Sequence, residues 1–313
     1  MDVGNTPLVC IDGVFAKLEC VNPTGSIKDR MAKFIIDESE KRGLLKPGMA
    51  IVEATSGNTG IALSYFGRQK GYEVIIVMPD DMTEERKELI RSFGAKLVLC
   101  SAEGSLLEAV RIRDEMAKDR RYFSTDQFSN ELNVECHYRT TGQEIIRQLR
   151  AASLMPDAFA AGVGTGGTLM GVAKALREVN PEVHIAAVEP AESPVMSGGV
   201  AAHHGIQGIG DGFVPDIVKG NDGKLSPLID QVIHVSSSEA LKEARFISQR
   251  RGYCVGVSSG ANVFAAKDLM SKFDCVVTIL PDGFNRYASV GLNSSSWCEY
   301  HGVGCRLIHS DIS

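Results

Sequence analysis

The chain has 313 residues, 44% of them hydrophobic, and a formal net charge of −6, which are ordinary proportions for a folded globular protein. This composition excludes a disordered chain, a collagen-like repeat and a small disulfide-stapled domain. The mild acidity disfavours nucleic-acid binding, and no apolar run approaches the roughly 20 residues needed to span a membrane. The N-terminus has no signal-peptide pattern, and the eight cysteines form no metal-binding pairs. We therefore expect a cytoplasmic protein with reduced cysteines, no bound metal, and no nucleic-acid or membrane partner.

Short β-rich apolar runs alternate with amphipathic helical patterns along the chain. The predicted strands are residues 50–54, 74–78, 97–100, 158–161, 184–188, 232–235 and 276–280. The predicted helices are residues 84–93, 106–118, 134–149, 169–179, 238–251 and 261–272. Such alternation predicts an α/β fold built from βαβ units with mostly parallel sheets.

Two of the predicted strands run into glycine-rich turns that are followed by helices. The first reads IVEATSGNTGIAL at residues 51–63, and the second reads FAAGVGTGGTLMG at residues 159–171. In such folds ligands bind at these turns, beyond the carboxyl ends of parallel strands. Two such turns predict two α/β lobes, each with a mostly parallel sheet flanked by helices, and an active site in the cleft between them.

The second turn, Gly162 to Thr168, is typical of an anion-binding site. Its backbone N–H groups lie at a helix N-terminus, which favours negative charge. No Lys-Ser/Thr follows the last glycine, and the spacing is not G-x-G-x-x-G, so ATP and NAD are disfavoured. A phosphate monoester fits, whereas the alternative is tight strand–helix packing without a ligand.

The segment NPTGSIKDR, residues 22–30, delivers Lys28 to the start of a predicted helix. The helix dipole disfavours an ammonium group at this end, and a neutral amine is what Schiff-base chemistry requires. The alternative is a solvated surface lysine.

The segment TSGNTG, residues 55–60, offers hydroxyls, an amide and backbone donors at another helix start. Such a loop can hold a carboxylate, although Ser, Thr and Asn are also ordinary helix caps. A lysine amine, a phosphate cradle and a carboxylate loop together match the needs of pyridoxal phosphate acting on an amino acid.

These motifs resemble the cysteine synthase (O-acetylserine sulfhydrylase) family of fold-type II pyridoxal-phosphate enzymes, which are related to cystathionine β-synthases and the tryptophan synthase β subunit. The resemblance runs from GNTPL at residues 4–8 to about Tyr287 and includes VEPAESPVMSGG and IQGIGDGFVP. We expect a smaller mobile lobe over residues 34–130, a larger phosphate-binding lobe over residues 1–33 plus 131–290, and a C-terminal extension over residues 291–313. The resemblance also implies a homodimer and a serine acetyltransferase as a further partner.

The family's functional residues map onto matching positions of this sequence. The resemblance implies that Lys28 forms the Schiff base with the cofactor and exchanges the substrate Cα proton. Asn58 would bind the ring 3′-oxygen and Ser258 would face the ring nitrogen. The phosphate would be bound by Gly164, Thr165, Gly166, Gly167 and Thr168. The substrate carboxylate would be bound by Thr55, Ser56, Gly57, Thr59 and Gln127.

The implied reaction is a β-replacement on an activated serine through an α-aminoacrylate, with O-acetylserine and sulfide giving L-cysteine. Alternatives within the fold convert cysteine to sulfide plus serine or lanthionine, make cystathionine or cyanoalanine, or use O-phosphoserine as donor. A serine/threonine dehydratase shares the fold but usually lacks this pairing of TSGNTG with IQGIG. An alternative of another class is a catalytically idle binding partner of a serine acetyltransferase.

The sequence departs from the family pattern at Asp211, where a small residue is usual. We expect an acid near the active-site entrance to repel acidic second substrates or to polarise a water or thiol nucleophile, so Asp211 is a candidate specificity residue. The alternative is a solvated residue in a glycine-rich turn. Residues 130–133 replace prolines that relatives often carry, and they either reshape the mouth of the pocket or improve a helix start. His203 and His204 are expected to be surface residues.

Overall fold

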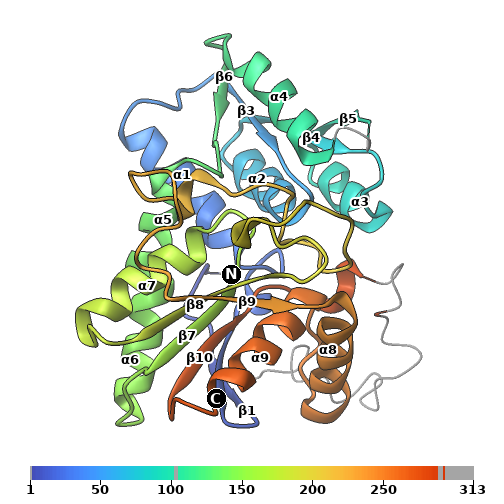
Figure 1. Ribbon diagram of the computed structural model, residues 1–313. Helices are drawn as coiled ribbons and strands as arrows, with labels where there is room; N and C mark the ends of the chain where they lie inside the picture. Colours follow the sequence, from blue (N-terminus) through green and yellow to red (C-terminus); the bar gives the residue numbers. More distant parts are fainter. Residues whose placement is uncertain (1, 102–104, 288–291, 293–313) are drawn as a thin grey trace.

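The computed structural model describes residues 2–101, 105–287 and 292. It contains a six-stranded and a four-stranded sheet, which lie one above the other in Figure 1 with helices packed around each. All strand pairs except one are parallel. The predicted α/β class with two mostly parallel sheets is therefore confirmed.

The larger sheet has the strand order β1-β2-β10-β7-β8-β9. These strands are β1 (Leu8–Ile11), β2 (Val14–Leu18), β7 (Ala158–Gly162), β8 (His184–Pro190), β9 (Gln231–Val235) and β10 (Val276–Leu280). The antiparallel hairpin β1–β2 was not predicted, although its two-residue turn Asp12-Gly13 has positive φ at both positions, the usual hairpin signal. The hairpin lies beside a strand that is distant in the sequence, because β2 pairs with β10.

The smaller sheet has the strand order β5-β4-β3-β6 and is entirely parallel. Its strands are β3 (Ala50–Ala54), β4 (Glu73–Pro79), β5 (Lys96–Cys100) and β6 (Tyr122–Ser124), and its helices are α2 (Asn58–Gln69), α3 (Glu84–Ser92) and α4 (Ser105–Ala117). Every residue of β3 is buried, which explains why its sequence is apolar on both faces, apart from Glu53, rather than alternating. The three-residue strand β6 was too short to predict.

The remaining helices are α1 (Lys28–Lys41), α5 (Glu131–His137), α6 (Gln143–Ala151), α7 (Gly167–Val179), α8 (Ser237–Arg251) and α9 (Val257–Leu269). The predicted helix 134–149 consists of α5 and α6 joined by a π-helical turn, Tyr138–Gly142. Inside it His137 Nδ1 lies 2.9 Å from Thr141 Oγ1, and π turns of this kind are frequent at functional sites. Short 3-10 turns occupy Glu19–Val21, Val195–Ser197, Asp216–Val218 and Phe284–Arg286.

Helix α1 belongs to the cores of both sheets. Ile27, just before it, packs in the core of the larger sheet, whereas Ala32 and Ile36 pack in that of the smaller sheet. The lobe boundaries at residues 33/34 and 130/131 therefore stay a prediction. Of the predicted extension 291–313, only Leu292 is described, and it is buried against the larger sheet; the rest lies outside the described residues.

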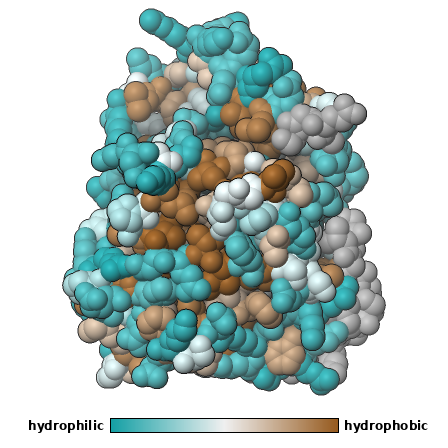
Figure 2. All heavy atoms as spheres, in the orientation of Figure 1, coloured by the Kyte–Doolittle hydropathy of each residue, from teal (hydrophilic) through white to brown (hydrophobic). Residues whose placement is uncertain are grey.

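The surface shown in Figure 2 is largely hydrophilic, with apolar side chains gathered in the middle of this face, between the levels of the two sheets. In the described part of the chain, every helix is too short or too polar to cross a bilayer.

Candidate active site

A cavity lies between the two sheets, where several helices begin. Residues at the starts of α1, α2, α7 and α9 line it, and none of these helices has a capping side chain. By contrast, α8 begins with a complete capping box of Ser236 and Glu239. Uncapped first-turn N–H groups carry partial positive charge, so the cavity is suited to anionic groups.

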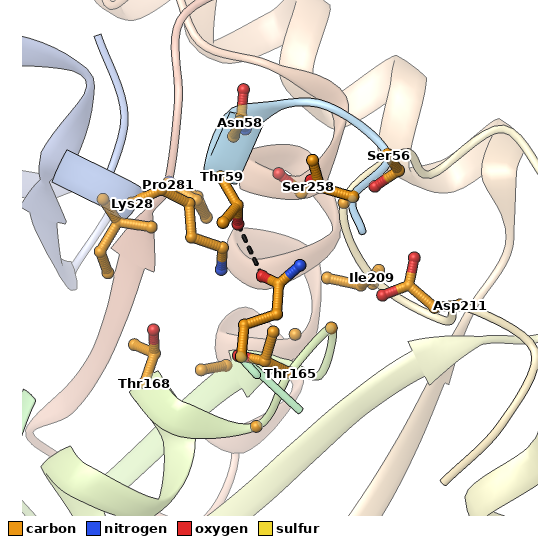
Figure 3. A pocket seen from close by; sticks show the side chains of 18 of the residues that line it. Lys28, Ser56, Asn58, Thr59, Thr165, Thr168, Ile209, Asp211, Ser258 and Pro281 are labelled. Atoms are coloured by element: carbon orange, nitrogen blue, oxygen red, sulfur yellow. Dashed lines mark hydrogen bonds between the residues drawn. The ribbon is translucent and has the colours of Figure 1, made fainter. Parts of the chain in front are cut away.

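Lys28 is the first residue of α1, as predicted, and it lines the cavity (Figure 3). Burial lowers the pKa of its amine, while the carboxylates of Asp211 and Asp282 act in the opposite direction. The sequence alone indicates the helix dipole as a reason for a neutral amine, and the structure adds burial. The preceding turn is fixed because Ile27 N donates to Pro281 O (2.8 Å) and Thr24 N donates to Asp29 Oδ2 (2.6 Å). The alternative of a solvated surface lysine is wrong.

The glycine-rich turn before α7 has no room for side chains. Gly166 adopts φ +85°, and a Cβ on Gly164 would lie 2.5 Å from the carbonyl oxygen of Gly208. Asn133 Nδ2 donates to Thr165 Oγ1 (2.9 Å), and Thr168 Oγ1 lies 3.3 Å from His137 Nε2. Four of the five predicted phosphate-binding residues line the cavity, whereas Gly167 packs behind it.

Asn58 and Ser258 lie on the cavity wall at the starts of α2 and α9 (Figure 3). Helix α9 begins four residues before its predicted start, and this brings Ser258 into its first turn. Asn58 Nδ2 donates to Asp282 Oδ2 (2.7 Å), which also accepts from the hydroxyl of Tyr287 (2.8 Å). Asn58 Oδ1 is buried and has no partner, so the wall offers an unused polar atom.

The predicted carboxylate-binding loop surrounds the start of α2. Thr59 Oγ1 donates to Gln127 Oε1 (2.6 Å, the dashed line in Figure 3), and Gln127 Nε2 donates to Ala54 O (2.8 Å). Thr55, Ser56, Thr59 and Gln127 line the cavity, whereas Gly57 lies just outside its lining and precedes α2 as the N-cap residue.

Glu53, at the end of buried strand β3, supports this loop and was missed by the sequence analysis. It accepts from the backbone N–H of Gln127 (3.2 Å), from the hydroxyl of Thr125 and from Arg113 Nη1 (3.1 Å). Burial raises its pKa, although Arg113 and these donors oppose the shift. The available signal was a carboxylate inside an otherwise apolar strand.

Asp211 lines the cavity from the side opposite Lys28 in Figure 3. Burial raises the pKa of its carboxyl group, while Lys28 and His204 lower it. The alternative of a solvated turn residue does not fit this position. His203 is exposed, as expected, but His204 is half-buried and its Nε2 lies 2.8 Å from the carbonyl oxygen of Gly210.

Two further cavity residues had no signal in the sequence. Asn262 fixes the strand end before the glycine turn, because its Oδ1 accepts from Gly162 N (2.8 Å) and its Nδ2 donates to Ile279 O (2.9 Å). Arg86 enters from the first turn of α3.

At residues 130–133, Asn130 caps α5 by accepting from Leu132 N (3.0 Å), which supports the interpretation of a better helix start.

Comparison with known proteins gives a consistent result. A family model described as pyridoxal-phosphate dependent enzyme matches residues 1–282. A cysteine synthase from Staphylococcus aureus is 40% identical over 304 residues, covering 93% of this chain and 95% of that protein.

Solved structures with the same fold include a hydrogen sulfide-producing enzyme from Fusobacterium nucleatum, 43% identical with a TM-score of 0.84, covering 89% of this chain and 83% of that one. A cysteine synthase from Entamoeba histolytica is 36% identical, with a TM-score of 0.84 and coverages of 93% and 89%.

Proposed function

Because the chain belongs to the cysteine synthase family of pyridoxal-phosphate dependent enzymes, we propose that it makes L-cysteine from O-acetylserine and sulfide. In this reaction the Cα proton and the β-acetate leave O-acetylserine, sulfur then bonds to Cβ, and a proton returns to Cα. The observation that carries the proposal is Lys28, a cavity-lining amine whose pKa is lowered by burial.

The cavity fits pyridoxal phosphate. The glycines of the turn at Gly164–Thr168 let its backbone pack closely against Gly208, Val218 and Asn133, and α7 begins there without a capping side chain, so the turn can present backbone donors to a phosphate. The unpartnered amide oxygen of Asn58 and the hydroxyl of Ser258 lie on the wall where ring substituents need polar neighbours. When bound, the cofactor supplies an electron sink for the bonding electrons left on Cα.

The chain's own residues would then position the substrate and move one proton. The uncapped start of α2, with Thr55, Ser56, Thr59 and Gln127, would bind the substrate carboxylate and orient the Cα–H bond towards Lys28. The neutral form of the Lys28 amine, favoured by burial, would accept the Cα proton and later return it. Ser258 would offer the ring nitrogen a hydroxyl rather than a carboxylate, which suits β-replacement better than transamination.

Asp211 favours a second candidate function, the hydrolytic release of sulfide from cysteine. A carboxylate in the cavity wall can accept a proton from water, whose oxygen then bonds to Cβ after the C–S bond breaks. The products would be serine and hydrogen sulfide. The fusobacterial relative, a hydrogen sulfide-producing enzyme, supports this candidate.

The test is a comparison of two assays on the purified holoenzyme. Wild type, Lys28→Ala and Asp211→Asn would each receive O-acetylserine plus sulfide, or cysteine alone, and cysteine, serine and sulfide would be quantified. We expect cysteine formation that Lys28→Ala abolishes and Asp211→Asn retains. Sulfide and serine from cysteine alone, lost in Asp211→Asn, would establish the second function instead. Neither product from wild type would refute both.

The remaining expectations concern assembly and location. We propose a homodimer that binds a serine acetyltransferase, as the family resemblance implies, and light scattering with and without the acetyltransferase would test both. We also propose a cytoplasmic location. Its support is that no disulfide joins the cysteines of the described ranges, which are Cys10, Cys20, Cys100, Cys136, Cys254 and Cys275.

A further inference from the structure

Arg86 is a buried cation on the cavity wall that the mechanism above does not use. It belongs to the first turn of α3, and only 2% of its surface is exposed. A positive charge at this end of a helix is opposed by the helix dipole. Its position is therefore unfavourable unless something in the cavity compensates the charge.

The contacts of Arg86 leave that charge unpaired. Its Nη1 donates to the amide oxygen of Gln207, and its guanidinium carbon lies 5.1 Å from the ring centroid of Tyr287. Its Nε is buried and has no hydrogen-bond partner. Across residues 2–101 and 105–287, Arg86 forms no ion pair with a carboxylate. A buried charge without a counter-ion is strongly unfavourable.

The side chain of Arg86 packs directly on the loop at the start of α2. A Cβ built on Gly57 would lie 2.3 Å from Arg86 Cδ and 2.6 Å from Arg86 Nε. The unused donor is therefore next to the uncapped helix start at which the proposed function places the substrate carboxylate. Among the described residues that line the cavity, Lys28 is the one other basic side chain, and the proposed function uses its amine in the neutral form.

We propose that Arg86 is a substrate-binding residue that supplies the counter-charge for the carboxylate of the amino acid substrate. This inference rests on the proposed function and adds a charged donor to a loop of neutral ones. Charge-assisted hydrogen bonds are about twice as strong as neutral ones, so the residue would contribute a large share of substrate affinity.

The competing explanation is structural: the sole role of Arg86 would be to connect α3 to the segment that carries Gln207. Gln207→Glu separates the two, because it places a carboxylate where Arg86 now meets an amide oxygen. If Arg86 binds the substrate carboxylate, this internal acid competes with it and weakens substrate binding. If Arg86 is only a bridge, the bridge becomes stronger and substrate binding is unchanged.

The experiment titrates holoenzymes with O-acetylserine while following the visible absorbance of the bound cofactor. The variants are Arg86→Gln, Arg86→Lys, Gln207→Glu and the control Arg91→Gln, an exposed arginine on the same helix. A second titration uses 2-aminoethyl acetate, which has the amine and ester but no carboxylate. Thermal unfolding of each variant is recorded in parallel.

We expect the apparent Kd for O-acetylserine to rise about tenfold or more in Arg86→Gln and Gln207→Glu. This Kd should rise less in Arg86→Lys and stay unchanged in Arg91→Gln. The Kd for 2-aminoethyl acetate should be the same in all variants. A Kd within twofold of wild type in both Arg86→Gln and Gln207→Glu overturns the inference while leaving the proposed function intact. A wild-type holoenzyme that responds to neither O-acetylserine nor cysteine refutes the proposed function, and the inference falls with it.

Discussion

At the scale of single residues, two carboxylates from distant parts of the chain face the amine of Lys28. Asp211 comes from the glycine-rich segment after β8, and Asp282 follows β10. Asp282 is already held by Asn58 and Tyr287, so its contribution is fixed by structure. Asp211 is therefore the member of the pair to vary by mutation, and it raises the pKa of Lys28 while burial lowers it.

The first prediction concerns the pH dependence of cofactor attachment. Asp211 raises the pKa of Lys28, so Asp211→Asn should lower that pKa further and keep the amine neutral at lower pH. Asp282 still faces the amine in this variant, and buried His137, whose pKa is lowered by burial, stays neutral. The rate of cofactor rebinding to the stripped enzyme, measured against pH, should move its midpoint to lower pH. A midpoint that stays in place or rises contradicts the assignment.

The second prediction concerns the glycine turn. Gly164→Ala would place a methyl group 2.5 Å from a backbone oxygen that cannot move independently. We expect a loss of about 1–3 kcal/mol in the free energy of unfolding and weaker cofactor retention during dialysis. The control is Gly205→Ala, whose Cβ would meet only the side chain of Ser237, at 3.3 Å. If both variants keep the cofactor and unfold alike, the close packing of the Gly164 turn is not needed to bind the phosphate.

At the scale of elements, the helices divide into those that cap themselves and those that do not. Helices α5 and α8 begin with Asn130 and Ser236, whose side chains accept backbone N–H bonds. Helices α1, α2, α7 and α9, whose first residues line the cavity, lack such caps, as do α3 and α6. Some of their first-turn N–H groups donate within the chain, as Lys28 N does to Ser26 Oγ (3.3 Å) and Gly167 N to Thr165 Oγ1 (3.4 Å). A ligand that binds the remaining donors would stabilise the folded protein further.

The third prediction follows from this division. Ser236→Ala removes the hydroxyl that accepts from Glu239 N, while Glu239 can still accept from the backbone N–H of residue 236, and it should lower the free energy of unfolding by about 1 kcal/mol. Cofactor affinity should be unchanged, because α8 does not line the cavity. Chemical denaturation and a fluorescence titration with pyridoxal phosphate measure the two quantities. A loss of cofactor affinity in Ser236→Ala would show that the α8 cap affects the cavity after all.

Sequence patterns predicted those elements whose burial is continuous or strictly periodic. The buried strands β3 and β10 were predicted with their observed bounds, whereas the β1–β2 hairpin was missed although its Asp12-Gly13 turn carries the signal. Among candidate site residues, Lys28, Asn58 and Ser258 lie in motifs that point to the cavity. Arg86 and Asp282 could not be found in this way, because each is an isolated charge that only the tertiary fold brings to the site, whereas Glu53 was missed although it interrupts an apolar strand.

At the scale of the whole molecule, a buried ion network anchors the Lys28 helix to the larger sheet. Arg30 on α1 pairs with Glu19 (Nε–Oε2, 2.7 Å) and with Glu144 of α6 (Nη1–Oε1, 2.7 Å). Lys17 of β2 also pairs with Glu144 (Nζ–Oε2, 2.8 Å). Because α1 also packs in the core of the smaller sheet, this network fixes the reactive amine relative to both halves of the cavity.

The fourth prediction concerns acid stability. Burial raises the pKa of Glu144, but Arg30 and Lys17 outweigh it and hold the pKa at about 2, below the usual 4.5. Its ion pairs therefore stabilise the fold fully above pH 4.5, and about 3 kcal/mol is lost as the pH falls from 4.5 through 2. Glu144→Gln should unfold more easily at pH 7 and show a flatter dependence of unfolding on pH in that window. Urea unfolding at several pH values gives the free energy of unfolding as a function of pH. If Glu144→Gln and wild type lose stability equally between pH 4.5 and 2, the ion network is not the cause of the acid sensitivity.

The pairing of β2 with β10 also determines the order in which a newly made chain can fold. Leu18 pairs with Leu280, so the N-terminal hairpin leaves the ribosome long before its neighbour exists. At 5–20 residues per second, this delay is on the order of 10–50 s. The smaller sheet is complete once Ser124 has emerged, and it can form during that interval. A nascent chain that ends before β10 thus carries the amine and the glycine turn but has no closed cavity, and the exposed edge of β2 is where a chaperone or a second nascent chain would bind it.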